Sequence, residues 1–153
     1  MIYKYLSFGV SISFISWMVG MILSTAVRKT KFYNNSLSNL NFIKNSKINK
    51  IIGINVLKWI VINTIFKYFN QKLKLKRRIE KPDLYNLRHE MTISEIDHLV
   101  GFIFVNVFAF VKIFTLEYLF AFVIFIVNVI MNLYPSLLQQ ENKRRIDKLI
   151  KRL

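Results

Sequence analysis

The chain has 153 residues, enough for one domain at most. Hydrophobic residues make up 54% of it, yet it carries 23 Lys and Arg against 8 Asp and Glu, a formal net charge of +15. This is too apolar for an ordinary soluble domain. The basic residues lie beside apolar runs of membrane length, which argues against nucleic acid as a partner. The lack of cysteine excludes disulfides and thiolate metal sites, and no spacing of His, Asp or Glu indicates a metal.

The first apolar run, residues 5–27, has no charged residue and is long enough to cross about 30 Å of hydrocarbon as a helix. A cleaved signal peptide is the alternative, because Ser24-Thr25-Ala26 offers small residues at a cleavage site. The run is longer than a typical signal sequence, and the basic residues after it would hinder export. We therefore predict a retained transmembrane helix.

Residues 28–95 are expected to form a basic cytoplasmic connector. Within it, residues 51–66 are apolar but short, and Lys58 interrupts them. They suit an interfacial or re-entrant helix better than a full span. Residues 67–81 carry seven Lys and Arg, a composition that indicates contact with anionic lipid headgroups.

Residues 96–114 and 118–140 are two further apolar runs, and the short break between them predicts a tight helical hairpin. Thr92 and Glu95 fit a capping box, so the second transmembrane helix is expected to start near Thr92. Residues 141–153 form a charged, amphipathic cytoplasmic tail whose apolar residues share one helix face. The predicted fold is therefore a single all-α integral membrane domain with about three transmembrane helices.

The distribution of charge predicts an orientation. Of the 23 basic residues, 21 fall in residues 28–98 and 141–153, and only Lys4 and Lys112 lie elsewhere. Basic residues stay on the cytoplasmic side of a membrane, so the N-terminus is expected outside and the C-terminus in the cytoplasm.

Glu95 and His98 lie three positions apart, so their side chains can meet on one helix face. An imidazole beside a carboxylate can take up and return a proton near neutral pH, which would make His98 a general base oriented by Glu95. Simpler roles are open as well. For Glu95 the alternative is a role in the capping box alone, and for His98 it is that of an interfacial polar residue.

A second group of polar residues surrounds Pro135, which is expected to kink the last helix because it frees the carbonyl of Met131. Asn128 and Asn132 are one turn apart and Asn106 lies in the facing helix, where amides commonly bond between helices. Beyond the proline, three polar residues are expected to share a cytoplasmic face: Gln139, Asn142 and Arg145. For the basic residues of this segment, capping of the helix end is the simpler role.

Both groups fit motifs of one protein family. Its first motif, E-T-x-x-x-E-x-x-H-W before an apolar span, corresponds to residues 90–99, where Glu90, Glu95 and His98 match. Its second, N-x-P followed by Q-R-Y-N-R-P-R-L near the chain end, is matched by Asn132, Gln139, Asn142, Lys143, Arg145 and Ile146. The chain departs from these motifs at Met91, Leu99, Gln140, Glu141 and Arg144, and Pro135 comes one residue late. With both motifs in this order, the chain resembles the glycosyl-4,4'-diaponeurosporenoate acyltransferase family, small bacterial membrane proteins of carotenoid pigment synthesis.

The resemblance implies an enzyme of the bacterial cytoplasmic membrane that transfers a fatty acyl group onto a sugar hydroxyl of a glycosylated carotenoid or similar lipid-linked acceptor. His98, Glu95 and Glu90 would be catalytic, and the substrates would contact Asn132, Gln139, Asn142, Lys143 and Arg145. No cofactor is expected to stay bound. The acyl donor would be a co-substrate, a thioester of coenzyme A or of acyl carrier protein, whose phosphate suits Lys143 and Arg144. The alternative is a non-catalytic membrane protein whose helical hairpin binds a membrane partner.

Helix geometry predicts where these residues meet. At about 1.5 Å per residue, Asn132 lies as deep in the hairpin as His98, whereas Gln139 and Asn142 need the kink at Pro135 to reach it. We therefore expect Glu95, His98 and Asn132 to line one polar pocket, with Arg145 at its rim.

Overall fold

A computed structural model of the chain describes residues 1–40, 42–43, 53–54, 56, 59, 63 and 80–153. Three long helical rods dominate this part: α1 (Ile2–Val27), α5 (Lys81–Phe114), and a third that joins α6 (Tyr118–Asn128), the π-helical turn η3 (Val129–Leu133) and α7 (Tyr134–Ile150). Each is long and apolar enough to cross a membrane, so the predicted all-α architecture with three candidate spans is confirmed. Two short helices, α2 (Lys31–Asn35) and the 3₁₀ turn η1 (Leu37–Asn39), follow α1. The helix predicted at residues 51–66 lies largely outside the described residues.

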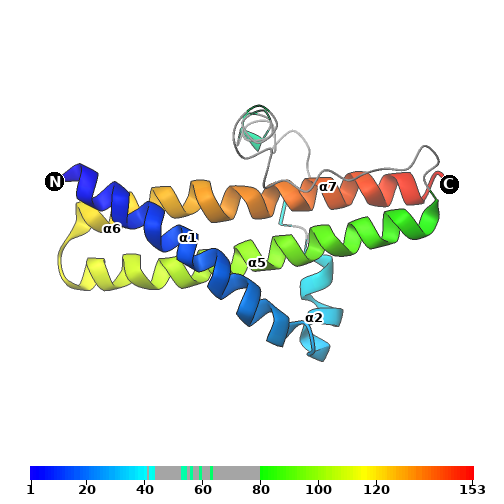
Figure 1. Ribbon diagram of the computed structural model, residues 1–153, viewed down its shortest axis with the longest axis horizontal. Helices are drawn as coiled ribbons and strands as arrows, with labels where there is room; N and C mark the ends of the chain where they lie inside the picture. The colour runs from blue at the N-terminus through cyan, green and yellow to red at the C-terminus, as the bar shows by residue number, and fades with distance from the viewer. Residues whose placement is uncertain (41, 44–52, 55, 57–58, 60–62, 64–79) are drawn as a thin grey trace.

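The second and third rods form an antiparallel hairpin, and α1 crosses them from the hairpin turn toward their middle (Figure 1). The turn spans residues 115–117, where Leu116 takes a left-handed φ of 62°. Lys112 Nζ lies 2.7 Å from Glu117 Oε1 across this turn, and that hydrogen bond lowers the pKa of the Glu117 carboxyl. The start of α1 packs at the same end, where the Tyr5 and Phe120 rings stack 4.2 Å apart.

The prediction that the second span starts near Thr92 is wrong, because α5 begins eleven residues earlier at Lys81. Glu80 and Asp83 form the capping box instead. Pro82 occupies the first turn, where a backbone N–H has no acceptor within the helix, so proline loses no hydrogen bond there. The Thr92 hydroxyl donates to the Arg88 carbonyl at 2.8 Å inside the helix. The last part of the expected connector is therefore helical, and α5 is long enough to lie along α7.

The amphipathic tail continues α7, and its apolar face packs on the extended start of α5. Ile146 is buried against Leu84 and Leu87, with Met91 and Ile150 partly buried beside them. Burial of these side chains stabilises the contact by about 1.5–3 kcal/mol each relative to exposure, as an upper estimate. A tail whose apolar side is used in this way has less apolar surface left for lipid.

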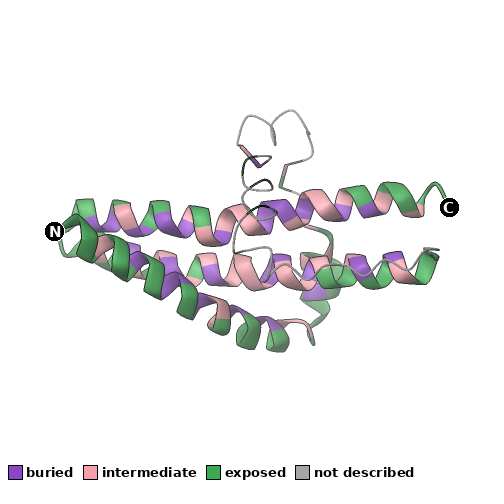
Figure 2. Cartoon of the chain, turned by 45° about the horizontal axis from the view of Figure 1, so that its top comes forward, coloured by how far each residue is buried: buried purple, intermediate pink, exposed green. Residues whose placement is uncertain are grey.

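Small residues let α1 approach its neighbours closely. Its buried face consists of Ile12 and five small residues spaced three or four positions apart: Gly9, Ser13, Ser16, Gly20 and Ser24. A Cβ at Gly20 would lie 2.2 Å from the Asp97 carbonyl oxygen, and one at Gly101 would lie 3.1 Å from the Ser16 carbonyl oxygen. Such stripes are typical of helix contacts in membranes, where close backbone packing replaces the hydrophobic effect. The buried residues of the long helices face one another, and the exposed ones point outward (Figure 2).

Candidate active site

His98 lies where α1, α5 and η3 meet. Its imidazole contacts the Trp17 ring edge to face, with centroids 5.9 Å apart and planes at 87°. Its Nδ1 atom is buried and has no hydrogen-bond partner within the described part of the chain. A buried nitrogen without a partner is costly in a packed helix bundle, so this atom is a candidate for chemistry.

Asn132 links His98 to a network of polar groups inside the bundle. Its amide nitrogen donates to Ser16 Oγ at 3.0 Å and to Asn128 Oδ1 at 2.8 Å. The Ser16 hydroxyl in turn donates to the Ser13 carbonyl at 2.7 Å, so its oxygen is the acceptor for Asn132. Asn128 donates to the carbonyl of Phe102, one turn before Asn106 in α5, at 2.9 Å, so its bond between helices is to backbone.

This network bears on which nitrogen of His98 carries the proton. The Asn132 side chain also lies beside the His98 imidazole. Because both amide hydrogens of Asn132 are used on Ser16 and Asn128, the group that faces the imidazole is Oδ1, an acceptor. An imidazole that carries its proton on Nε2 would match this acceptor, since Nδ1 is the nitrogen without a partner among the described residues. In that tautomer Nδ1 is an acceptor, the state that a general base requires.

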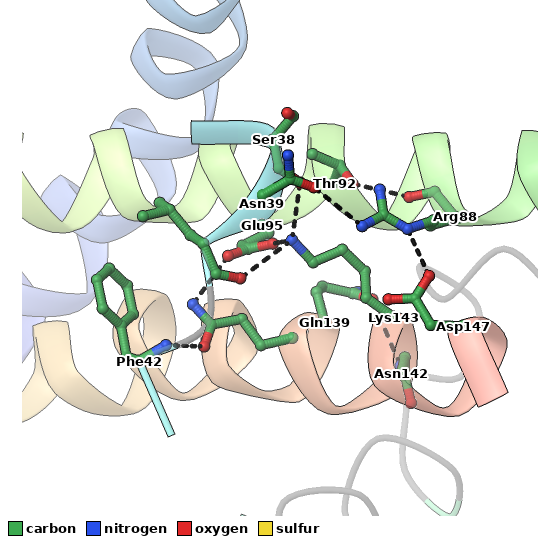
Figure 3. Close-up of polar contacts among 12 residues, drawn as sticks. Ser38, Asn39, Phe42, Arg88, Thr92, Glu95, Gln139, Asn142, Lys143 and Asp147 are labelled. Atoms are coloured by element: carbon green, nitrogen blue, oxygen red, sulfur yellow. Dashed lines mark hydrogen bonds and ion pairs between the residues drawn. The ribbon is translucent and has the colours of Figure 1, made fainter. Parts of the chain in front are cut away.

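Glu95 occupies a separate site toward the far end of the hairpin, which Figure 3 shows. It forms a salt bridge with Lys143 of α7, and the two side chains are 0% and 4% exposed. Gln140 donates to Glu95 Oε1 at 2.8 Å and accepts from the Phe42 backbone N–H at 3.0 Å. A buried ion pair persists only when further hydrogen bonds satisfy its charges, and these contacts do so for the carboxylate.

The segment after α1 covers this ion pair. Lys143 Nζ lies 3.4 Å from each of two backbone carbonyl oxygens, those of Ser38 and Leu40. Arg88 holds the same segment by donating to Asn39 Oδ1 at 3.2 Å, and its Nε lies 2.6 Å from Asp147. We call Glu95, Gln140 and Lys143, with the backbone groups of Ser38, Leu40 and Phe42, the ion-pair cluster. It ties three parts of the chain together.

The residues of the expected single pocket therefore lie in two separate groups. Asn132 lies beside His98, but the Glu95 carboxylate is engaged by Gln140 and Lys143 and does not orient the imidazole. Glu90 is exposed, and at five residues from Glu95 it lies about 140° away around the helix.

The residues expected to bind substrate are distributed over α7. Gln139 and Asn142 are half-buried and hydrogen bond to each other at 3.4 Å. Arg145 is exposed and pairs with Glu141. Lys143 is enclosed in the ion-pair cluster, so its ammonium is not free for a donor phosphate. Among the described residues, no group of three His, Asp or Glu side chains could hold a metal ion.

Sequence reasoning missed four residues of these two sites: Ser16, Trp17, Asp97 and Gln140. The small-residue spacing of α1 would have predicted that Ser16 faces a neighbouring helix. Asp97 anchors α1 through a hydrogen bond from Ser24. Gln140 was noted only as a departure from a motif, yet it is 1% exposed and central to the ion-pair cluster.

Comparison with known proteins identifies the family. The model of the glycosyl-4,4'-diaponeurosporenoate acyltransferase family matches residues 29–152. The chain belongs to this family. It is therefore an acyltransferase of carotenoid synthesis, which implies an acyl donor and a glycosylated carotenoid as substrates. The match covers both sites except for the residues that α1 contributes. No match is found among curated proteins or solved structures.

Proposed function

We propose that the protein transfers a fatty acyl group from a thioester directly to a sugar hydroxyl of a glycosylated carotenoid, with His98 as the general base. The supporting observation is the position of the imidazole beside Trp17 and Asn132, with Nδ1 buried and without a partner among the described residues. In this arrangement the ring can accept a proton at Nδ1 while it stays beside Asn132. General-base catalysis of this kind contributes about 10²–10⁴-fold in rate.

The proposed reaction needs no acyl-enzyme intermediate. The sugar O–H donates its proton to His98 Nδ1 while its oxygen attacks the thioester carbonyl. The tetrahedral intermediate collapses with cleavage of the C–S bond, and the imidazolium returns the proton to the leaving thiolate. Asn132 Oδ1 stabilises the imidazolium between these steps through its hydrogen bond to Nε2. Direct transfer is consistent with a chain that has no cysteine.

We assign Glu95 a positioning role, since its carboxylate fixes α7 against α5 through the ion-pair cluster. Gln139, Asn142 and Arg145 are proposed to bind the acyl donor at this end of the hairpin, with Arg145 contacting its phosphate. Lys143 supports them indirectly by holding the helix. For Glu90, the match to the family motif is the remaining support for a catalytic role.

The protein is proposed to lie in the bacterial cytoplasmic membrane with its N-terminus outside. Lys112 lies at the hairpin turn and Lys4 close by, at the end where α1 starts. The other described basic residues lie beyond the spans at the opposite end, which the positive-inside rule assigns to the cytoplasm. The acyl donor then approaches the ion-pair cluster from the cytoplasm, and the acceptor reaches His98 through lipid.

The test is acyl transfer by membranes that contain His98→Ala, with a glycosylated carotenoid and an acyl-CoA as substrates. We expect a fall in rate of about 10²-fold or more at normal protein level, because the proton acceptor is lost. His89→Ala is the matched control, since His89 is the only other histidine and is exposed on the same helix. Full activity in His98→Ala would show that His98 is not the base.

A further inference from the structure

Two rings that touch where α1 meets α5 each carry a nitrogen without a partner among the described residues. The Trp17 and His98 rings are in contact, and within the described residues neither Trp17 Nε1 nor His98 Nδ1 has a hydrogen-bond partner, although both atoms are buried. Four other polar side chains of this junction are hydrogen bonded: Ser13, Ser16, Asn128 and Asn132. Two unsatisfied groups in one otherwise satisfied network point to a ligand that supplies both missing bonds.

The chemistry of the two nitrogens restricts that ligand. An indole N–H can only donate a hydrogen bond, whereas His98 Nδ1 accepts one in the protonation state described above. A single group that satisfies both must accept one hydrogen bond and donate another. A hydroxyl does so, while a carboxylate has no hydrogen to give and an ammonium has no lone pair to offer.

Trp17 is open to lipid on its other side. Its ring is half-buried and packs edge to face on Phe14, with centroids 4.8 Å apart. Phe14, Met18 and Met21, on the same side of α1, are all exposed. A lipid-dissolved molecule can therefore reach the Trp17 ring without passing through the bundle.

The packing of α1 holds Trp17 at a fixed depth. Ser16, the preceding residue, bonds to Asn132, and Gly20, one turn later, touches the Asp97 backbone too closely to admit a methyl group. Ser24 bonds to the Asp97 side chain. Three contacts over two turns leave α1 little freedom to slide, so the indole stays opposite the imidazole.

We infer that Trp17 is a substrate-binding residue whose indole N–H binds the sugar hydroxyl that His98 deprotonates. This inference deepens the proposed function and rests on it for the identity of the hydroxyl. It assigns a role to α1, which lies outside the residues that the family model matches. The indole then holds the oxygen while Nδ1 takes the proton, and a donor bond of this kind also helps to orient the attacking lone pair.

The direct test is the indole N–H signal of the full chain in lipid nanodiscs, recorded by ¹⁵N–¹H NMR. The chain has two tryptophans, so two signals are expected, and Trp17→Phe identifies which belongs to Trp17. A glycosylated carotenoid added without acyl donor should shift the Trp17 signal and leave that of Trp59 unchanged. The same carotenoid without its sugar should shift neither. No shift with the glycoside, or an equal shift with the sugar-free carotenoid, would overturn the inference.

The kinetic test compares Trp17→Phe, which keeps a ring but loses the N–H, with Trp59→Phe. We expect kcat/KM for the glycosylated acceptor to fall about 5- to 10-fold in Trp17→Phe, as for loss of one hydrogen bond, and to stay near the wild-type value in Trp59→Phe. Equal values in both variants would remove Trp17 from the site. The two proposals fail separately: an active His98→Ala variant with a shifted Trp17 signal refutes the base but supports the hydroxyl site.

Discussion

Replacing Lys143 with methionine should strongly destabilise the protein. The substitution keeps the length and apolar stem of the side chain but removes the ammonium that faces Glu95, Ser38 and Leu40. Glu95 is 0% exposed, so its carboxylate would remain in the bundle with Gln140 as the one bonded neighbour from α7. The perturbation therefore creates an uncompensated buried charge.

The magnitude follows from the burial of both partners. Removal of one partner from a buried ion pair costs about 3–5 kcal/mol, because the other charge keeps its desolvation penalty. For a chain of this size each kcal/mol corresponds to about 2–4 °C in melting temperature, so Lys143→Met should melt about 6–20 °C lower. Lys148→Met is the matched control, since Lys148 is an exposed lysine on the same helix and should change Tm little.

The assay is thermal unfolding in detergent, followed by the fraction of protein that stays monodisperse. Glu95→Gln combined with Lys143→Met should be more stable than Lys143→Met alone, because the double variant has no buried charge left unpaired. The ion-pair cluster does not hold the helices together if Lys143→Met and Lys148→Met melt at the same temperature. The same conclusion follows if the effects of Glu95→Gln and Lys143→Met on Tm are additive.

Two further perturbations probe the packing and the orientation. Gly20→Ala should destabilise by about 1–3 kcal/mol, measured by the same melting assay, because its Cβ would lie 2.2 Å from the Asp97 carbonyl oxygen. Gly9→Ala should cost less, since its nearest neighbours at 3.3 Å belong to a side chain, and equal effects would contradict the close contact of α1 with α5. Reporters fused after Val111 should signal from outside and those after Leu153 from the cytoplasm, and a cytoplasmic signal from the first fusion would refute the proposed orientation.

The number and type of the long helices could be predicted from the sequence because few backbone conformations can span lipid. An uncharged run of some 20 residues must satisfy its backbone internally, which makes it a helix. The start of α5 could not be placed in this way, since it lies in polar sequence where local signals compete. Thr92 with Glu95 and Glu80 with Asp83 both suit a cap, and Pro82 favours the second because proline fits a first turn.

Spacing along the helices predicted one contact of the site and not the other. Asn132 was placed beside His98 from depth alone, and the structure puts it there. The partner of Glu95 was mistaken because three-residue spacing permits contact with His98 but does not require it. An oppositely charged side chain on a facing helix is the stronger attraction for a buried carboxylate. Identifying that side chain as Lys143 needed the relative rotation of α5 and α7.

That rotation is set by η3. Proline at 135 has no N–H, and the helix around Asn132 widens into a π-helical turn that takes up about one extra residue. A regular helix at about 3.6 residues per turn would continue the buried face of Asn128 to Gln139 and Asn142. One extra residue moves the face to Gln140 and Lys143, which are the residues that the structure buries. A single wide turn thus decides which side chains of α7 meet Glu95 and which are left on the outer side of the helix.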